Sequence, residues 1–254
     1  MKSFFSKKSI LGTMAVAAVC MLGTGNAQAQ EFTIQGDLVS SYVWRGIYQG
    51  GAASFQPTLG FSVGNFSLTA WGSTSLSESN KEIDLTAAYK FGEAGPTLSV
   101  ASLWWNGQAD VANGELTNDY FHFKSGDTGH HFEAGLAYTL PIEKFPLSIA
   151  WYTMFAGADR KTTDEGEEKQ AYSSYVELNY PFSVKGVDLN ATCGVVPYKT
   201  PQYNVNGFAV TNLALKATKA INFNDKFSLP IFAQAIWNPC VEDAFLVFGV
   251  TLRP

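Results

Sequence analysis

The chain contains three histidines, His122, His130 and His131, which are the residues best suited to catalysis or metal binding. A hydrolase of the serine type needs a histidine beside a nucleophile and an acid, but no G-x-S-x-G segment accompanies these histidines. His130 and His131 are adjacent, so their side chains would point to opposite faces of a strand, which is poor geometry for one metal ion. We therefore expect no enzymatic activity, no catalytic residue, no cofactor and no metal site.

Charged residues recur at alternate positions of otherwise apolar segments. Glu82, Asp84 and Lys90 alternate with apolar residues such as Ile83 and Leu85. Side chains two residues apart in a strand lie on the same face, so the pattern predicts a strand with one charged and one apolar face. Acidic side chains on the face that lines a pore favour cations.

Segments of this kind repeat along the chain. Stretches of about ten residues that alternate between apolar and polar are typical of transmembrane β-strands. We therefore predict an all-β fold, a single transmembrane antiparallel β-barrel of about 12 strands. The predicted strands are residues 32–45, 55–63, 66–75, 82–91, 97–105, 130–140, 147–155, 171–180, 187–196, 208–219, 227–237 and 244–253.

The connections between the predicted strands alternate in length. The long connections are residues 46–53, 76–80, 106–129, 156–170, 197–207 and 238–243, and the short ones are 64–65, 92–96, 141–146, 181–186 and 220–226. In outer-membrane barrels the short turns face the periplasm and the longer loops face outside. We expect the same here, with both ends of the barrel domain on the periplasmic side.

Aromatic residues favour a membrane barrel over a soluble β-sandwich, in which strands also alternate. They occur at both ends of the apolar faces, as in the aromatic girdles of membrane proteins. The predicted outer row is Trp44, Phe55, Trp104, Phe155, Tyr172 and Trp237, and the predicted inner row is Phe32, Phe66, Phe91, Tyr138, Tyr180 and Phe227.

The N-terminus has the pattern of a cleaved signal peptide. Lys2, Lys7 and Lys8 precede an apolar stretch, which is followed by Ala27-Gln28-Ala29, a small-x-small cleavage pattern. We predict a signal peptide at residues 1–29 and an outer-membrane barrel at 30–254. The net charge of −5 argues against nucleic acid as a partner, and outer-membrane lipid and small solutes are the partners we expect.

Part of the chain resembles a known family. Ser40-Ser41-Tyr42-Val43-Trp44-Arg45-Gly46, followed by Phe55-Gln56-Pro57, resembles the opening of the TorF-like porins of Gram-negative bacteria, and so do Ala70-Trp71-Gly72-Ser73 and Glu82-Ile83-Asp84-Leu85. The resemblance covers roughly residues 37–92 and implies a small outer-membrane barrel of the porin type.

The face opposite the apolar one would line the barrel interior. Its charged residues, our candidate pore-lining residues, are Asp37, Arg45, Glu82, Asp84, Lys90, Glu133, Glu177, Asp188 and Lys216. Their acidic excess predicts a narrow pore for passive diffusion of small solutes, with a mild preference for cations. Arg45, expected high on the first strand, is the predicted constriction residue with an acidic partner.

Two alternatives to a porin remain from the sequence. The interior charges can instead pair with one another in a plugged lumen, because side chains largely fill a barrel of this size. The protein would then be a closed structural or adhesive barrel that acts through its extracellular loops. The other alternative is an outer-membrane hydrolase that uses the histidines.

Overall fold

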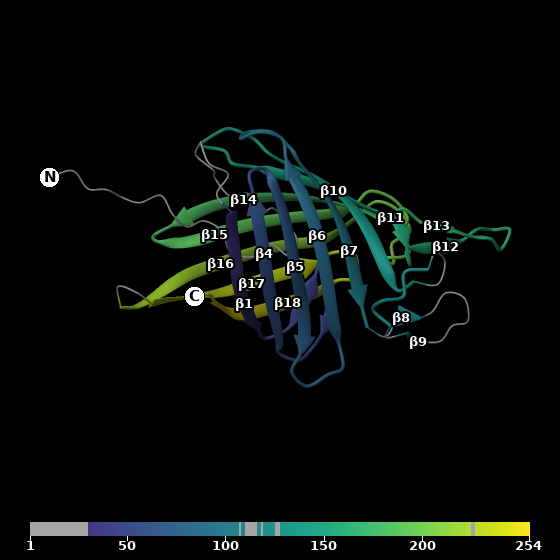
Figure 1. The fold of residues 1–254 in the computed structure, drawn as a ribbon, viewed down its shortest axis with the longest axis horizontal. Coiled ribbons are helices and arrows are strands. Elements are labelled where there is room, and N and C mark those ends of the chain that lie inside the picture. Colours follow the sequence, from purple (N-terminus) through teal and green to yellow (C-terminus); the bar gives the residue numbers. More distant parts are fainter. Residues whose placement is uncertain (1–29, 107, 110–115, 118, 125–127, 225–226) are drawn as a thin grey trace.

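Twelve strands of the computed structural model form one closed barrel (Figure 1). The structure describes residues 30–106, 108–109, 116–117, 119–124, 128–224 and 227–254, so the predicted signal peptide lies outside the described residues. Within these ranges no helix is long and apolar enough to cross a membrane.

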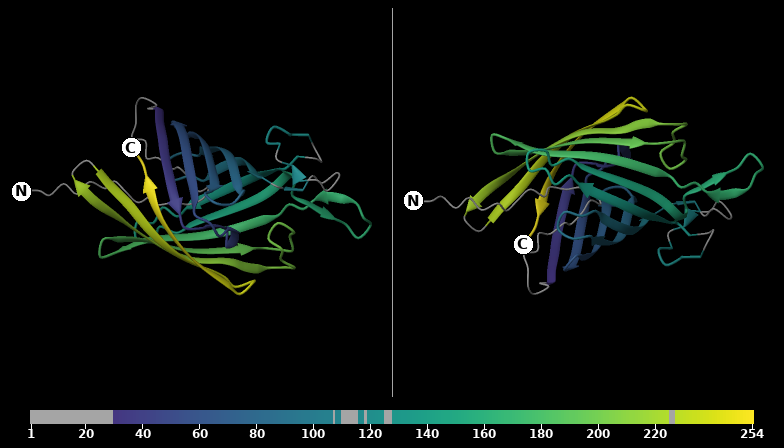
Figure 2. Two further views of the ribbon diagram at one scale, coloured as in Figure 1. Left: turned by 90° about the horizontal axis from the view of Figure 1, so that it is seen from below. Right: turned by 90° about the horizontal axis from the view of Figure 1, so that it is seen from above.

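The barrel strands follow one another in chain order, and each pairs antiparallel with its neighbours. β1 pairs with both β4 and β18, which closes the wall, and Figure 2 shows β1 in purple beside β18 in yellow. The predicted antiparallel all-β barrel is therefore confirmed. Its strands are β1 (Gln30–Val39), β4 (Ser54–Val63), β5 (Phe66–Ser75), β6 (Lys81–Lys90), β7 (Thr97–Trp105), β10 (His130–Thr139), β11 (Ser148–Gly157), β14 (Ser174–Val184), β15 (Val187–Val196), β16 (Ala209–Asn224), β17 (Phe227–Asn238) and β18 (Asp243–Leu252).

Alternation along the strands separates the two faces of the wall. On β6, Glu82 and Asp84 are buried inside the barrel, whereas Ile83 and Leu85 are exposed outside. The same alternation around the barrel gives an exposed apolar belt, which includes Ile34, Leu59, Leu68, Leu85, Val100, Leu136, Ile149, Leu215, Ile231 and Leu246. A soluble monomer rarely exposes a continuous apolar surface of this extent.

Most of the predicted aromatic rows lie on the outer face. Phe55, Phe155, Tyr172, Trp237, Phe32, Phe66, Phe91 and Phe227 are exposed, and Tyr138 and Tyr180 are half-buried. The prediction for Trp44 is wrong, because its side chain is buried inside the barrel. Trp104 faces outward but is buried, because the rings of Tyr120 and His130 pack against it.

Three small hairpins lie within the long connections. They are β2 (Tyr42–Trp44) with β3 (Ile47–Gly50), β8 (Gln108–Ala109) with β9 (Leu116–Thr117), and β12 (Arg160–Thr162) with β13 (Glu168–Gln170). Figure 1 shows the β12–β13 hairpin and the C-terminus at opposite ends of the barrel. The first residue of β1 pairs with Val63, beside the short Gly64-Asn65 turn, so β1 begins at the short-turn end. The long connections lie together at the other end, which we call the outer end.

Several predicted boundaries are wrong. The first strand ends at Val39 rather than at residue 45, because the chain leaves the wall at Ser40 and turns into the barrel. β14 and β16 continue past the predicted ends at residues 180 and 219, since pairing extends to Val184 and Asn224. The intervening turns are correspondingly shorter than expected.

Candidate functional site in the barrel interior

The β2–β3 hairpin folds into the outer end of the barrel, and we call it the plug hairpin. Its Trp44 and Ile47 are paired, and the two residues between them, Arg45 and Gly46, have positive φ values of 50° and 82°. Positive φ at both central residues is the requirement of a type I′ turn, the favoured connection in a two-residue hairpin. Arg45 therefore lies at the tip of the hairpin and not on β1 as expected.

The turn fits closely against the barrel wall at β16 and β17. A Cβ atom added to Gly46 would lie 1.8 Å from the carbonyl oxygen of Thr211 at the start of β16. The Nδ2 amide of Asn238, at the end of β17, donates a hydrogen bond of 3.1 Å to the Gly46 carbonyl oxygen. Glycine is required here both for the close approach and for the positive φ.

The Arg45 guanidinium is enclosed by acceptors and aromatic faces. Its two terminal nitrogens donate hydrogen bonds of 2.6 and 2.8 Å to the carboxylate oxygens of Glu133 on β10. It also donates a hydrogen bond of 2.7 Å to the hydroxyl oxygen of Tyr203, and it lies 4.6, 4.5 and 4.8 Å from the ring centres of Trp44, Tyr152 and Tyr175. A buried charge with a bidentate partner and cation–π contacts is well compensated.

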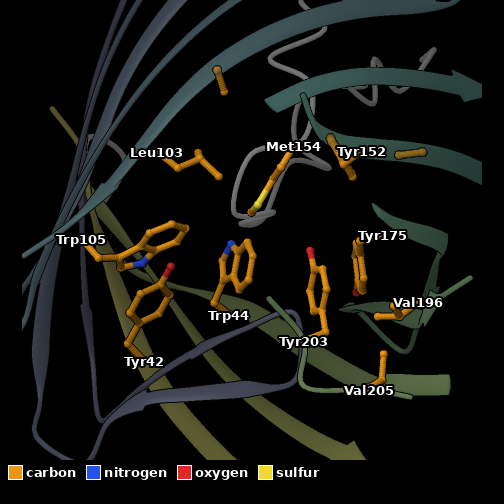
Figure 3. Close-up of a cluster of buried hydrophobic side chains, with 12 residues drawn as sticks. Tyr42, Trp44, Leu103, Trp105, Tyr152, Met154, Tyr175, Val196, Tyr203 and Val205 are labelled. Atoms are coloured by element: carbon orange, nitrogen blue, oxygen red, sulfur yellow. The ribbon is translucent and has the colours of Figure 1, made fainter. Parts of the chain in front are cut away.

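Aromatic rings surround this ion pair, and Figure 3 shows how the rings stack. Tyr203 stands between Trp44 and Tyr175. The centre of its ring lies 5.6 Å from that of Trp44 and 5.7 Å from that of Tyr175, with interplanar angles of 7° and 15° respectively. On its other side Trp44 meets the edge of Trp105 on β7, at 5.4 Å. Trp71, Trp105, Tyr152, Tyr175 and Phe232 also pack inside the barrel.

Tyr203 comes from the connection at 197–207, whose role sequence reasoning missed because this segment has no periodicity. A bridge between Thr200 and Val205 shapes the segment, and the Thr200 hydroxyl donates to the Ser173 hydroxyl. Ser173 in turn donates from its backbone to Asp159 at 2.8 Å. Burial raises the pKa of the Asp159 carboxyl above its ordinary value, although the hydrogen bonds from Ser173 oppose the shift.

Carboxylates outnumber bases beside the plug hairpin. Glu82 and Asp84 on β6 are buried, as is Glu133, but among the described residues Arg45 forms an ion pair only with Glu133. Within the described part of the chain, neither Glu82 oxygen has a hydrogen-bond partner, nor does Oδ1 of Asp84. The outer half of the lumen therefore holds two buried carboxyl groups, those of Glu82 and Asp84, that form no ion pair among the described residues.

The other predicted lining residues lie outside this group. Asp37 and Lys216 are buried inside, and the Lys216 ammonium lies 3.6 Å from the Phe232 ring centre. The remaining three, Lys90, Glu177 and Asp188, are half-buried. All nine predicted residues thus lie on the inner side, although the structure brings only Arg45, Glu82, Asp84 and Glu133 together at the plug.

Small polar side chains line the rest of the inner wall. The half-buried residues there include Thr58, Thr69, Thr86, Ser99, Asn190, Thr192 and Thr218. Some form a network: the Thr192 hydroxyl and the Asn190 side-chain amide both donate to the side-chain Oδ1 of Asn179, at 2.7 and 3.0 Å. Below the plug hairpin the lumen is therefore polar.

His130 and His131 lie on opposite sides of the wall, as expected for adjacent strand residues. His131 faces inward against the Trp105 ring, at 5.1 Å. His130 faces outward, where its Nδ1 lies 2.7 Å from the Ser102 hydroxyl and its Nε2 lies 2.6 Å from the Tyr120 carbonyl oxygen. In the described ranges, no group of three or more His, Cys, Asp or Glu side chains is arranged to hold a metal ion.

Comparisons with known proteins assign no family. No protein-family model matches the chain, and no curated protein matches it, so the resemblance to TorF-like porins stays a prediction. A crystal structure described as an outer membrane channel from Pseudomonas putida F1 aligns over 91% of this chain and 98% of that chain, with 11% identity and a TM-score of 0.40. At this identity and TM-score, the similarity assigns neither a family nor a function to the chain.

Proposed function

We propose that the protein is an outer-membrane channel for passive diffusion of small solutes, with the plug hairpin as its constriction. The observation that carries this proposal is that, in the described part of the chain, the plug hairpin lies inside the barrel without pairing with the strands of the wall. Within the residues described, β2 and β3 pair with each other and with no barrel strand, and polar side chains line the lumen beyond them. The hairpin can therefore move without any wall pairing being broken.

The outer surface supports a position in a membrane. The exposed apolar belt encircles the wall, and exposed aromatic residues lie toward both ends of the strands. This surface is favourable in contact with acyl chains and costly in water, and a closed barrel satisfies the backbone groups of the wall within a bilayer. Outer-membrane lipid is accordingly the partner that we propose for this surface.

The interior charges support a preference for cations. Glu82, Asp84 and Glu133 are all buried in this part of the lumen, and Arg45 forms an ion pair with Glu133. Low-dielectric walls strengthen the field of such groups, which raises the local concentration of cations.

Liposome swelling and planar-bilayer recording test this proposal directly. Purified protein should admit small neutral solutes into liposomes and carry a cation-selective current in a potassium chloride gradient. A variant in which a short Gly-Ser linker replaces residues 42–50 should conduct more than wild type. The proposal fails if neither protein lets any solute through.

That failure would support a closed structural or adhesive barrel. The observation that favours this second candidate is the dense packing of Trp44, Tyr203 and Tyr175 across the outer end. It predicts an impermeable barrel whose long loops carry the function.

We also infer that the Ser102–His130 pair is not a hydrolase centre, although a serine and a histidine in contact favour one. The His130 side chain is 0% exposed, and the Phe123 ring stacks on it at 4.4 Å, so a substrate cannot reach the imidazole. Its contacts instead attach the 119–123 segment to the wall. Ester hydrolysis that is lost in Ser102→Ala would overturn this inference.

A further inference from the structure

A small polar cavity lies beside the plug hairpin. Its volume is about 150 Å³, and it lies between the hairpin and the outer ends of β4 to β7. Tyr42, Glu82 and Trp105 contribute to its lining, together with polar groups such as Ser73 and Asn80. The cavity is large enough for a small solute rather than a single water.

Unpartnered polar atoms surround this cavity. Among the residues described, both Glu82 carboxylate oxygens, the Tyr42 hydroxyl and the Trp105 Nε1 are buried and form no hydrogen bond of good geometry. Tyr42 and Trp105 lie close enough to the Glu82 carboxyl to interact with it. Exposure of the three side chains is 2%, 8% and 8% respectively. Buried polar groups are almost always satisfied in proteins, and a buried carboxylate in particular needs a counter-charge.

The nearby bases do not supply that counter-charge. Arg45 is bound to Glu133 and Tyr203. Lys81 also contributes to the lining, but its ammonium lies over the Trp104 ring, at 5.8 Å. A cation from solution is therefore required if Glu82 is to be ionised and paired.

The surroundings of Glu82 favour an organic ammonium over a metal ion. Tyr42 and Trp105 bring aromatic rings to the cavity, and aromatic faces attract ammonium groups. Metal ions prefer several carboxylate, imidazole or thiolate ligands, and the described residues hold no group of three such side chains suitably placed. The Tyr42 hydroxyl and the Trp105 N–H can also donate hydrogen bonds to a polar substituent of the same solute.

We propose that this cavity binds a small organic cation, with its ammonium group on Glu82 and its body between Tyr42 and Trp105. The site would hold the solute on the outer side of the Arg45–Glu133 pair, before passage into the lumen. This inference rests on the proposed channel, because it names the class of solute that the channel selects.

Tryptophan fluorescence of the folded protein in detergent, titrated with ethanolamine hydrochloride, tests the site without requiring transport. Wild type should show a saturable change that equal concentrations of sodium chloride do not produce. Glu82→Gln removes the counter-charge and should weaken binding about tenfold or more. Glu165→Gln, on the exposed outer loop, is the matched control and should bind as wild type does.

Tyr42→Phe provides a second variant if Glu82→Gln does not fold. It removes only the hydroxyl and should weaken binding about three- to tenfold. The site is disproved if wild type shows no saturable change, or if Glu82→Gln or Tyr42→Phe binds ethanolamine as tightly as wild type does.

Planar-bilayer currents separate failure of the site from failure of the channel. A protein that conducts potassium but does not bind ethanolamine disproves the site and leaves the channel standing. A protein that binds ethanolamine in a Glu82-dependent way but conducts nothing disproves the channel and supports the site. Where both hold, ethanolamine should reduce the potassium current in wild type and much less in Glu82→Gln.

Discussion

The guanidinium of Arg45 and the carboxylate of Glu133 form a bidentate ion pair inside the barrel, with hydrogen bonds of 2.6 and 2.8 Å. Arg45 lies in the turn of the plug hairpin and Glu133 lies on the wall strand β10. The pair therefore fixes the hairpin to the wall across the lumen, and it is the most direct point at which to perturb the constriction.

Arg45→Ala should loosen the plug and change the current. The variant loses both hydrogen bonds to Glu133 and leaves that carboxylate buried and unpaired, which costs about 3–5 kcal/mol of unfolding free energy. We expect higher conductance and stronger cation selectivity in a planar bilayer. Arg160→Ala, on the β12–β13 hairpin outside the barrel wall, is the control. An unchanged current–voltage curve for Arg45→Ala would remove Arg45 from the constriction.

Removal of both partners should cost less than the sum of the two single changes. In Arg45→Ala/Glu133→Ala neither charge is left unpaired, whereas each single variant leaves one behind. Urea unfolding of the four proteins in detergent gives the coupling free energy, which we expect to exceed about 1.5 kcal/mol. Additive effects would show that the pair contributes little beyond its separate contacts.

Gly46→Ala should displace the plug hairpin because its Cβ atom would overlap the Thr211 carbonyl oxygen. Gly166→Ala is a close control, since Gly166 has a φ of 81° and no atom within 4 Å of an added Cβ. The control carries the strain of positive φ without the overlap. We expect greater liposome permeability for Gly46→Ala than for Gly166→Ala, and equal permeability would mean that the turn does not control passage.

Leu59→Arg tests whether the apolar belt faces lipid. Leu59 is 57% exposed at the middle of β4, and Leu76, which is 61% exposed, lies just beyond the outer end of β5. Arginine at the lipid-facing midplane costs about 2–4 kcal/mol, and near the interfaces it costs about 0–1 kcal/mol. Folding into liposomes should therefore be impaired by Leu59→Arg and little affected by Leu76→Arg. Equal folding of both would indicate that water surrounds the wall.

Tyr203 should contribute mainly through its stacked ring. Tyr203→Phe removes only the acceptor for Arg45, at a cost of about 1 kcal/mol. Tyr203→Ala also removes the ring between Trp44 and Tyr175, at a cost of about 3–5 kcal/mol. Thermal unfolding of the two variants measures the difference. A Tyr203→Ala protein as stable as Tyr203→Phe would mean that the 197–207 segment is not held in the lumen.

Period-2 alternation by itself determined the barrel class and the face of each strand residue. Glu82 and Asp84 were predicted inside and Ile83 outside, and the structure agrees, because successive residues of a strand must point to opposite faces. The alternation of long and short connections likewise predicted which strand ends lie together. Both features arise from local geometry, which is why a sequence reveals them.

Tertiary structure alone decided where the segment at 40–53 lies. The alternation from Tyr42 to Trp44 is that of a strand in the wall, so Trp44 was expected to face lipid. The structure places this segment inside the barrel because Arg45 finds Glu133, Tyr203 and three aromatic rings there, and because Gly46 fits against β16. These partners are distant in sequence: Arg45 and Glu133 are 88 residues apart, and Arg45 and Tyr203 are 158 apart. Only closure of the barrel brings them together.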